Sequence, residues 1–241
     1  MSLPSEPEYS ICITHYNDAT TVEESIASIL GQLDHAFEVI VVDNFSTDGS
    51  YEVLKRLSEE GRITLYQSRC TRGRGRQLAF MKSRGNYIVA NMDMDDIFLP
   101  NLRKLLELYH SKFKGRVLRV SRSVVDGIDN YSNVTISTRE TIQKVGGWRD
   151  VNWYEDLDFW YRAMKMNLFS EITFPIMIRR QGQGRNSIFS RLRHRHLVYK
   201  EFFRTGLLRS QVNLTVRWAS LPVFIVAWFS AKFHPLRLSE T

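Results

Sequence analysis

Hydrophobic and amphipathic segments alternate along the first part of the chain. Residues 10–16 and 37–42 are short, continuous apolar runs, which are typical of strands covered on both faces. Between them, residues 22–33 place apolar side chains at the spacing of one helix face, after a polar turn that can start a helix. The pattern predicts a strand, a helix and a second strand.

The alternation then continues. We predict a helix at 51–60, a strand at 63–66, an Arg- and Gly-rich loop at 69–75, a helix at 76–83 and a strand at 87–90. Further along, we predict helices at 102–112, 139–145 and from 154, with strands at 116–121, 134–137 and 171–178. Strand-helix alternation with short connections predicts an α/β fold with a mostly parallel sheet flanked by helices.

Charge is distributed unevenly. The net charge is +7, yet residues 176–241 alone hold 12 Lys and Arg against 2 Asp and Glu. Such a basic segment suits nucleic acid, an anionic membrane or a phosphate-bearing substrate. Within it, residues 218–231 are 14 uncharged positions with Trp218 and Trp228, and Arg217 and Lys232 flank them.

A spanning helix needs about 20 apolar residues, so this run is too short to cross a bilayer and suits shallow interfacial insertion. The alternative is a C-terminal helix packed on the domain. Residues 1–9 lack a secretory signal pattern, and the two cysteines, Cys12 and Cys70, form no disulfide framework or metal motif. We therefore expect the protein to lie at the cytoplasmic face of a membrane, as a peripheral or shallowly inserted protein.

An acidic cluster follows the strand at 87–90. Asp93, Asp95 and Asp96 place three carboxylates within four residues. Like charges this close destabilise a fold unless a cation offsets them, although an acidic loop that caps the helix after Pro100 is the simpler alternative. Polar segments at 14–17 and 43–49 also follow predicted strands, and parallel strands deliver their carboxyl ends to one sheet edge. Their convergence favours a ligand site.

The order of these motifs resembles the inverting glycosyltransferases of family 2, which have the GT-A fold. The motifs are Thr14-His15-Tyr16-Asn17, the run 41–49 around Asp43, Asp93-Met94-Asp95-Asp96, Gly146-Gly147-Trp148 and Glu155-Asp156-Leu157-Asp158. The resemblance covers residues 10–185. The chain departs from it where Thr14-His15 replaces a common Pro-Thr and Asn44 replaces a common Asp.

The resemblance implies a nucleotide-sugar donor site. Its nucleotide-binding residues would be Thr14, Tyr16, Asn17, Asp43, Arg76 and Asp93. Asp95, with Asp93, would hold Mg²⁺ or Mn²⁺ against the diphosphate, because hard cations bind through one or two carboxylates plus phosphates. Arg179, Arg180, Gln183 and Arg185 would close over the diphosphate as a lid, or simply begin a membrane-facing surface.

The resemblance also implies a catalytic base. Asp156 would take the proton of an acceptor hydroxyl, as direct displacement requires. Four residues would position the acceptor or sugar: Asp96, Trp148, Glu155 and Asp158. For Trp148 a place in the core is the alternative, and for the acidic run 155–158 the alternative is a favourable interaction with the helix dipole.

These expectations divide the chain into three parts. Residues 1–100 would form the nucleotide-sugar-binding half and residues 101–190 the acceptor and catalytic half of one domain, followed by a membrane-associating helical tail at 191–241. The expected function is metal-dependent, inverting transfer from a UDP- or GDP-type donor to a lipid-linked or membrane glycan. A polyprenyl-phosphate sugar synthase and, more distantly, a sugar nucleotidyltransferase are alternatives, and nucleic acid is not an expected partner.

Overall fold

The computed structural model describes residues 6–179. The helices are α1 (Val22–Leu30), α2 (Ser50–Glu59), α3 (Arg72–Lys82), α4 (Leu102–Lys112), α5 (Arg139–Val145) and α6 (Glu155–Lys165). The strands are β1 (Tyr9–His15), β2 (Phe37–Asp43), β3 (Thr64–Gln67), β4 (Tyr87–Ala90), β5 (Asp96–Phe98), β6 (Val117–Val125), β7 (Ile128–Tyr131), β8 (Thr135–Thr138), β9 (Phe169–Thr173) and β10 (Met177–Arg179).

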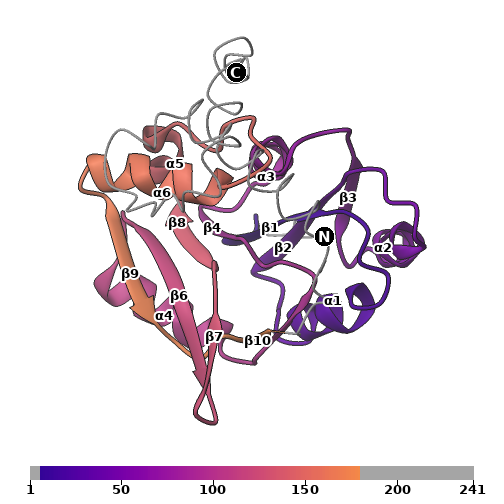
Figure 1. Cartoon of the computed structure of the whole chain (residues 1–241), viewed down its shortest axis with the longest axis horizontal. Helices are drawn as coiled ribbons and strands as arrows, with labels where there is room; N and C mark the ends of the chain where they lie inside the picture. Colours follow the sequence, from indigo (N-terminus) through magenta and orange to yellow (C-terminus); the bar gives the residue numbers. More distant parts are fainter. Residues whose placement is uncertain (1–5, 180–241) are drawn as a thin grey trace, which may run out of the picture.

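A single mixed sheet forms the centre of the molecule, in the order β3-β2-β1-β4-β8-β6-β7, with β9 paired to β6 (Figure 1). The strands β1 to β4 are parallel, whereas β8 runs antiparallel to β4 and β6 antiparallel to β8. The pairing of β4 with β8 joins the first and second parts of the chain in one sheet. The predicted α/β architecture is confirmed.

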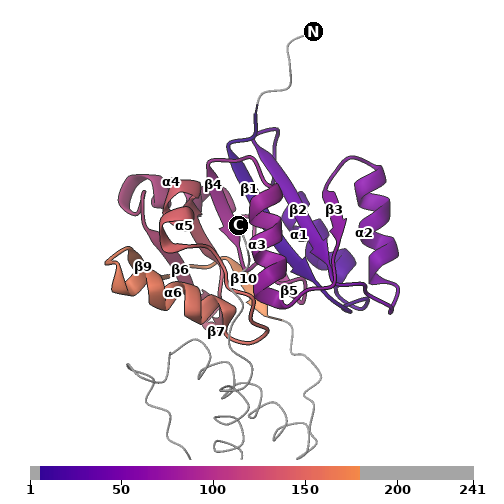
Figure 2. The ribbon, with the colours of Figure 1, turned by 90° about the horizontal axis from the view of Figure 1, so that it is seen from above.

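Helices cover both faces of this sheet, because consecutive strand residues point to opposite sides. Ile11 and Ile13 face a core shared with α1, α2 and α4, whereas Cys12 between them faces a core shared with α3, α5 and α6. Figure 1 shows α3, α5 and α6 along one side of the sheet, and in Figure 2 β5 and β10 lie near the end of β1 opposite to its first residues. The continuous apolar runs of β1 and β2 therefore arise from burial on both faces.

The helix predicted at 76–83 begins four residues earlier, at Arg72. Thr71 is its N-cap, and the Thr71 hydroxyl accepts a hydrogen bond from the backbone N–H of Arg74 at 3.2 Å. The glycines that indicated a loop are required by packing instead. A Cβ on Gly73 would lie 1.9 Å from the Arg149 carbonyl oxygen, and one on Gly75 would lie 2.1 Å from Thr14 Cγ2.

The strand predicted at 171–178 is two strands in two sheets. β9 ends at Thr173, and β10 pairs antiparallel with β5 in a separate small sheet. Pro175 lies between them, and proline cannot continue a hydrogen-bonded strand. β5 itself was not predicted, and its first residue is Asp96 of the acidic cluster, directly opposite Arg179.

The described residues contain no helix long and apolar enough to cross a bilayer. The predicted tail at 191–241, with its apolar run at 218–231, lies outside the described residues, as do the lid residues Arg180, Gln183 and Arg185.

Candidate active site

The loops after β1 and β2 meet at the carboxyl edge of the parallel strands. His15 and Asp43, the last residues of these strands, are paired in register. Beyond them, the Asn17 side-chain oxygen accepts from the Thr47 backbone N–H at 2.8 Å, and the Asn17 backbone N–H donates to the Ser46 hydroxyl at 3.0 Å. The predicted convergence of these two polar segments is confirmed, and Asn17 acts in it as a brace between the loops.

Asp43 is fully buried beneath this edge. Its carboxylate accepts hydrogen bonds from the backbone and side chain of Ser46 and, at 3.2 Å, from the Gln67 side chain. These bonds hold the loop after β2 in place. The nearby Tyr16 side chain is 56% exposed, so it offers an open aromatic face at the sheet edge, whereas Thr14 packs against Gly75 of α3.

Four carboxylates gather where the loop after β1 meets the loop after β4. Burial and the charges of Asp95 and Asp93 raise the pKa of Asp96 to about 8. Burial and the charges of Asp95, Asp48 and Asp93 raise the pKa of Asp18 to about 6. Asp95 also has a raised pKa, through burial and then Asp93. Holding this cluster ionised therefore costs free energy.

Asp18 was not predicted as a site residue, because in the sequence it is part of a polar turn. Its position directly after β1, at the same sheet edge as the other three acids, is the signal that could have identified it.

The cluster fits a divalent cation. Hard cations take oxygen ligands, and one buried oxygen of Asp96, Oδ1, has no hydrogen-bond partner among the described residues. No group of three or more Asp, Glu, His or Cys side chains in residues 6–179 is arranged so that it could hold a metal ion by itself. Asp93 and Asp95 therefore suit a cation that takes its remaining ligands from a bound diphosphate.

Arg76 connects this cluster to the second acidic motif. Its guanidinium is 5% exposed, and its Nη2 donates to Asp93 Oδ1 at 3.2 Å, while Nη1 forms an ion pair with the buried Glu155. Arg76 was expected at the opening of its helix, but it lies in the second turn of α3 and points inward. One buried arginine thus spans from the end of β4 to the start of α6.

Asp156 follows Glu155 in the first turn of α6. Its side chain is half-buried, and Oδ1 accepts from the backbone N–H of Leu157 at 2.7 Å. Tyr154, just before the helix, has a left-handed backbone with a φ of 59°, which ends the preceding loop abruptly. The ion pair between the adjacent Glu155 and Arg76 links this turn of α6 to the acidic cluster.

Asp158 is buried in an ion-pair cluster, so it does not reach an acceptor directly, and its predicted role in acceptor positioning stays a prediction. It is 1% exposed, and its oxygens pair with Arg149 at 3.2 Å and Arg162 at 2.9 Å. Arg162 also donates to the carbonyls of Val145 and Gly147. These contacts clamp the turn after α5 to α6.

Trp148 does not line the site, and the prediction that it stacks on a sugar ring is wrong. It is 1% exposed, and its ring stacks on Phe159 with centroids 4.6 Å apart. The double glycine before it turns the chain into the core, so the alternative stated from the sequence is the correct one.

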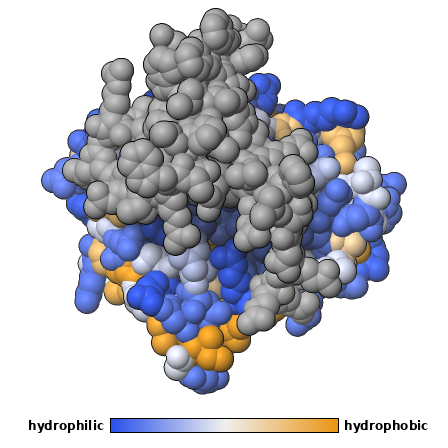
Figure 3. Space-filling model, viewed as in Figure 1, coloured by the Kyte–Doolittle hydropathy of each residue, from blue (hydrophilic) through white to orange (hydrophobic). Residues whose placement is uncertain are grey.

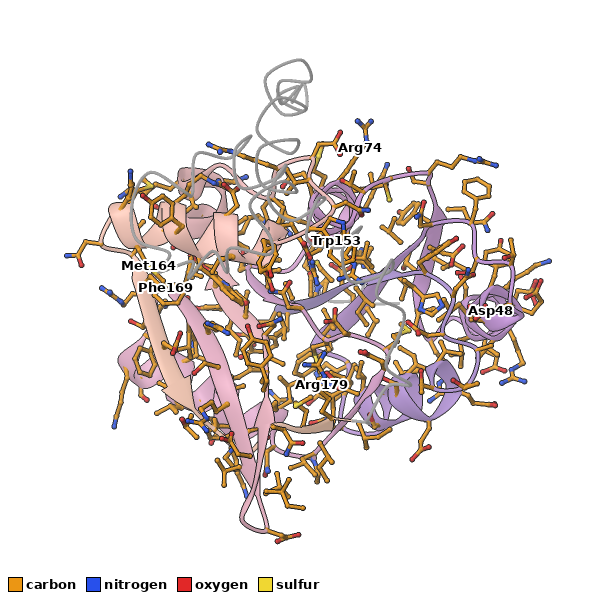
Figure 4. All side chains as sticks on the ribbon, viewed as in Figure 1. Asp48, Arg74, Trp153, Met164, Phe169 and Arg179 are labelled. Carbon is orange, nitrogen blue, oxygen red and sulfur yellow. The ribbon has the colours of Figure 1, made fainter. Side chains whose placement is uncertain are left out.

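The loop from 149 to 154 instead packs on the start of α3. Thr71 donates to Asp150 at 2.6 Å, and the guanidinium of Arg72 lies 5.4 Å from the centre of the Trp153 ring. Beside this contact is a pocket of about 380 Å³ that includes Arg69 and Arg74. Figure 4 shows Arg74 near the top of the view, with Trp153 below it and Arg179 lower still.

Arg179 is the only predicted lid residue within the described part. Its backbone N–H donates to the Asn130 side chain at 3.1 Å, and its charge lowers the pKa of Asp95 and Asp96 against the effect of burial. It therefore lies beside the acidic cluster, opposite Asp96 in the small sheet of β5 and β10.

Comparisons with known sequences agree with this geometry. The model of glycosyl transferase family 2 matches residues 10–172. An uncharacterised glycosyltransferase from Nostoc is 28% identical over 124 residues, which is 50% of this chain and 38% of that protein. The Escherichia coli glucosyltransferase WfaP, named for a UDP-Glc donor and a GlcNAc-diphosphoundecaprenol acceptor, is 30% identical over 91 residues. That match is 37% of this chain and 36% of WfaP, so the matched segment spans well under half of either relative.

Solved structures share the fold. S. aureus TarS in complex with UDP-GlcNAc matches with a TM-score of 0.64 at 18% identity, over 91% of this chain and 79% of that one. The mannosyltransferase PcManGT from Pyrobaculum calidifontis, in complex with GDP-Man and Mn²⁺, matches with a TM-score of 0.66 at 18% identity, over 97% and 77%. The chain therefore belongs to glycosyl transferase family 2 and has the GT-A fold.

Proposed function

We propose that the protein is a metal-dependent, inverting glycosyltransferase that moves a sugar from a UDP- or GDP-type donor to an acceptor hydroxyl. The observation that carries this proposal is the shared contact of Arg76 with Asp93 and Glu155. Through it, the carboxylates suited to a metal and diphosphate lie next to the carboxylate suited to a base. A transferase of this kind needs the diphosphate-binding carboxylates and the catalytic base on either side of the one sugar that is transferred.

The donor would lie along the carboxyl edge of β1, β2 and β4. Tyr16 offers an exposed ring for the nucleobase of the donor, and Asp43 anchors the loop beneath this ring. Asp93 and Asp95 would hold Mg²⁺ or Mn²⁺, which would neutralise the departing nucleoside diphosphate. Two structural neighbours contain UDP-GlcNAc and GDP-Man with Mn²⁺, which supports a nucleotide-sugar donor and a divalent metal.

Asp156 would act on the acceptor. A half-buried carboxylate at the start of α6 can accept the proton of an attacking hydroxyl while the leaving group departs from the opposite face of the sugar. Direct displacement of this kind inverts the anomeric configuration. Glu155 is held by Arg76 and would position this turn, whereas Asp96, at the start of β5, would support the sugar of the donor.

The acceptor is proposed to be a lipid-linked or membrane glycan. WfaP acts, by its name, on a sugar linked to diphosphoundecaprenol, and residues 191–241 combine basic residues with tryptophans. We expect the full chain to co-sediment with vesicles containing anionic phosphatidylglycerol, and to do so less at high salt, because exposed charges are screened. Equal sedimentation after deletion of residues 191–241 would contradict this role for the tail.

The function is tested by measuring what leaves the donor. We expect release of UDP or GDP from a panel of sugar nucleotides in the presence of Mn²⁺ and an extract of undecaprenyl-linked glycans, and none with EDTA. NMR of the product should show an inverted anomeric centre. Formation of pyrophosphate from a nucleoside triphosphate and a sugar phosphate would instead identify a nucleotidyltransferase.

The buried bridge at Arg76 gives a stability prediction. Arg76→Met leaves Glu155 buried without its partner, so we expect the free energy of unfolding to fall by about 3 kcal/mol or more. The matched control is Arg56→Met, which removes an exposed pair with Glu23 and should cost less than about 1 kcal/mol. Urea unfolding measures both. Equal losses in the two variants would show that the buried pair has no special weight, and a second change, Glu155→Leu, should recover part of the loss.

A further inference from the structure

A second cavity lies outside the donor site. Its volume is about 410 Å³, within the range of about 300–1,000 Å³ that small-molecule pockets occupy. It lies between β6, β7 and β9, at the end of the sheet away from β1, β2 and β3. The residues lining it are Arg119, Ser121, Arg122, Asp129, Tyr131 and Glu171.

The charges in this cavity balance. Arg119 pairs with Glu171 at 3.2 Å, and the Arg122 guanidinium donates to Asp129 at 2.9 Å. A phosphate or carboxylate ligand would meet both carboxylates and be repelled. A neutral ligand rich in hydroxyl groups would instead find donors and acceptors side by side.

The cavity also has an aromatic face. Tyr131 is 53% exposed, and its hydroxyl accepts from Arg119 Nη2 at 2.7 Å, which holds the ring in position. The register of β6 against β9 shifts between Val120 and Arg122, a bulge that redirects the side chains on this part of β6. Planar polar groups around a fixed aromatic ring suit a pyranose, which has hydroxyl groups at its edge and an apolar C–H face.

Contacts through the core lead from this cavity to the reacting groups. The Arg119 guanidinium lies 4.1 Å from the centre of the Trp160 ring. Trp160 Nε1 donates to the Thr135 hydroxyl, which also accepts from Asn91, two residues before Asp93. Trp160 is four residues after Asp156 on α6, so the two residues share a helix face about 6 Å apart along the axis.

We propose that the cavity between β6, β7 and β9 binds a neutral sugar ring of the acceptor, with Tyr131 as its stacking surface. This inference rests on the proposed transferase function and adds that the acceptor is a glycan of more than one sugar, extending from Asp156 along β6. Donor and acceptor would then occupy opposite ends of the sheet edge and meet at the start of α6.

The test uses the full chain on an array of immobilised neutral oligosaccharides, in the presence of UDP, GDP and Mn²⁺. We expect capture on a subset of glycans, and Tyr131→Ala should weaken it roughly tenfold or more, as loss of a central aromatic contact does. Tyr131→Phe keeps the ring and should retain most of the binding. The control is Ile128→Ala, which removes a 65% exposed apolar residue on the same strand outside the cavity.

The thermal shift produced by the two diphosphates with Mn²⁺ separates the outcomes. If a diphosphate raises the melting temperature but no glycan is captured, or Tyr131→Ala binds as the wild type does, the sugar subsite is overturned and the donor site stands. If glycans are captured through Tyr131 but no diphosphate binds, the cavity binds sugars, but the transferase function fails and with it the assignment of the cavity to an acceptor. If no glycan is captured and no diphosphate binds, both the sugar subsite and the transferase function are overturned.

Discussion

Asp156→Asn is expected to stop sugar transfer while leaving donor binding intact. The side chain lies in the first turn of α6, next to Glu155, and Arg76 links Glu155 to Asp93 of the acidic cluster. An asparagine keeps the shape and the hydrogen bond to the Leu157 N–H but cannot take a proton. Because a positioned general base contributes roughly a hundredfold to ten-thousandfold to rate, turnover should fall within that range.

The competing explanation for Asp156 is a favourable interaction with the helix dipole. That explanation predicts a loss of only about 0.3–1 kcal/mol of stability and normal turnover. Glu140→Gln is the matched control, since Glu140 is an exposed acid in the first turn of α5. Turnover, melting temperature and the diphosphate-induced shift are measured for both variants. An active Asp156→Asn enzyme would remove Asp156 as the base and revive a mechanism whose acceptor is already a phosphate.

Asp95→Ala should abolish metal-dependent donor binding and leave the metal-free protein as stable as the wild type or more so. The second expectation follows from the pKa of Asp95, which burial and Asp93 raise. At neutral pH the charged Asp95 costs the folded state free energy, so its removal relieves the cluster. Burial and the Asp95 charge also raise the pKa of Asp96, which should fall in the variant.

This variant is measured by thermal shift with Mn²⁺ alone, UDP or GDP alone, and the two together. Ligands that bind only the folded state raise stability by about 2.7 kcal/mol at a hundred times their dissociation constant, so loss of the site is easily seen. Glu107→Ala, an exposed carboxylate on α4, serves as the control. A wild-type response to Mn²⁺ and diphosphate in Asp95→Ala would assign the cation to other ligands.

The sheet could be predicted from sequence because its determinants are local. The apolar runs of β1 and β2 and the helical spacing of α1 place these elements within a few residues of their observed bounds. The start of α3 could not be predicted in this way. Gly73 and Gly75 look like loop residues until the Arg149 carbonyl and Thr14 are known to lie against them, and those contacts come from distant parts of the chain.

The same limit applies to the acidic motif on α6. Asp156 and Asp158 are two residues apart and equivalent by sequence, yet only Asp158 is buried between Arg149 and Arg162. The i,i+4 spacing of Asp158 and Arg162 was a usable local signal, whereas the contact with Arg149 depends on the turn after α5. Trp148 has no such local signal. Only its tertiary contact with Phe159 shows that it is a core residue and not a surface for stacking on a sugar ring.

An exposed apolar surface remains at the end of the β6–β7 hairpin. Val124 and Ile128 on the hairpin and Ile178 on β10 are each more than 40% exposed, and Figure 3 shows hydrophobic residues gathered at that end of the molecule. This surface adjoins the cavity proposed for the acceptor but does not line it. It is therefore a suitable place for control substitutions in the acceptor experiments.

The central claim is that the cluster at the end of β4 binds a nucleoside diphosphate through a divalent cation. It is tested most directly by the melting temperature of the wild-type chain with UDP, GDP, ADP and CDP, each with and without Mn²⁺. We expect UDP or GDP to raise the melting temperature in a concentration-dependent way, and far more with Mn²⁺ than without it. No shift with any diphosphate in the presence of metal would contradict the donor site and the function built on it.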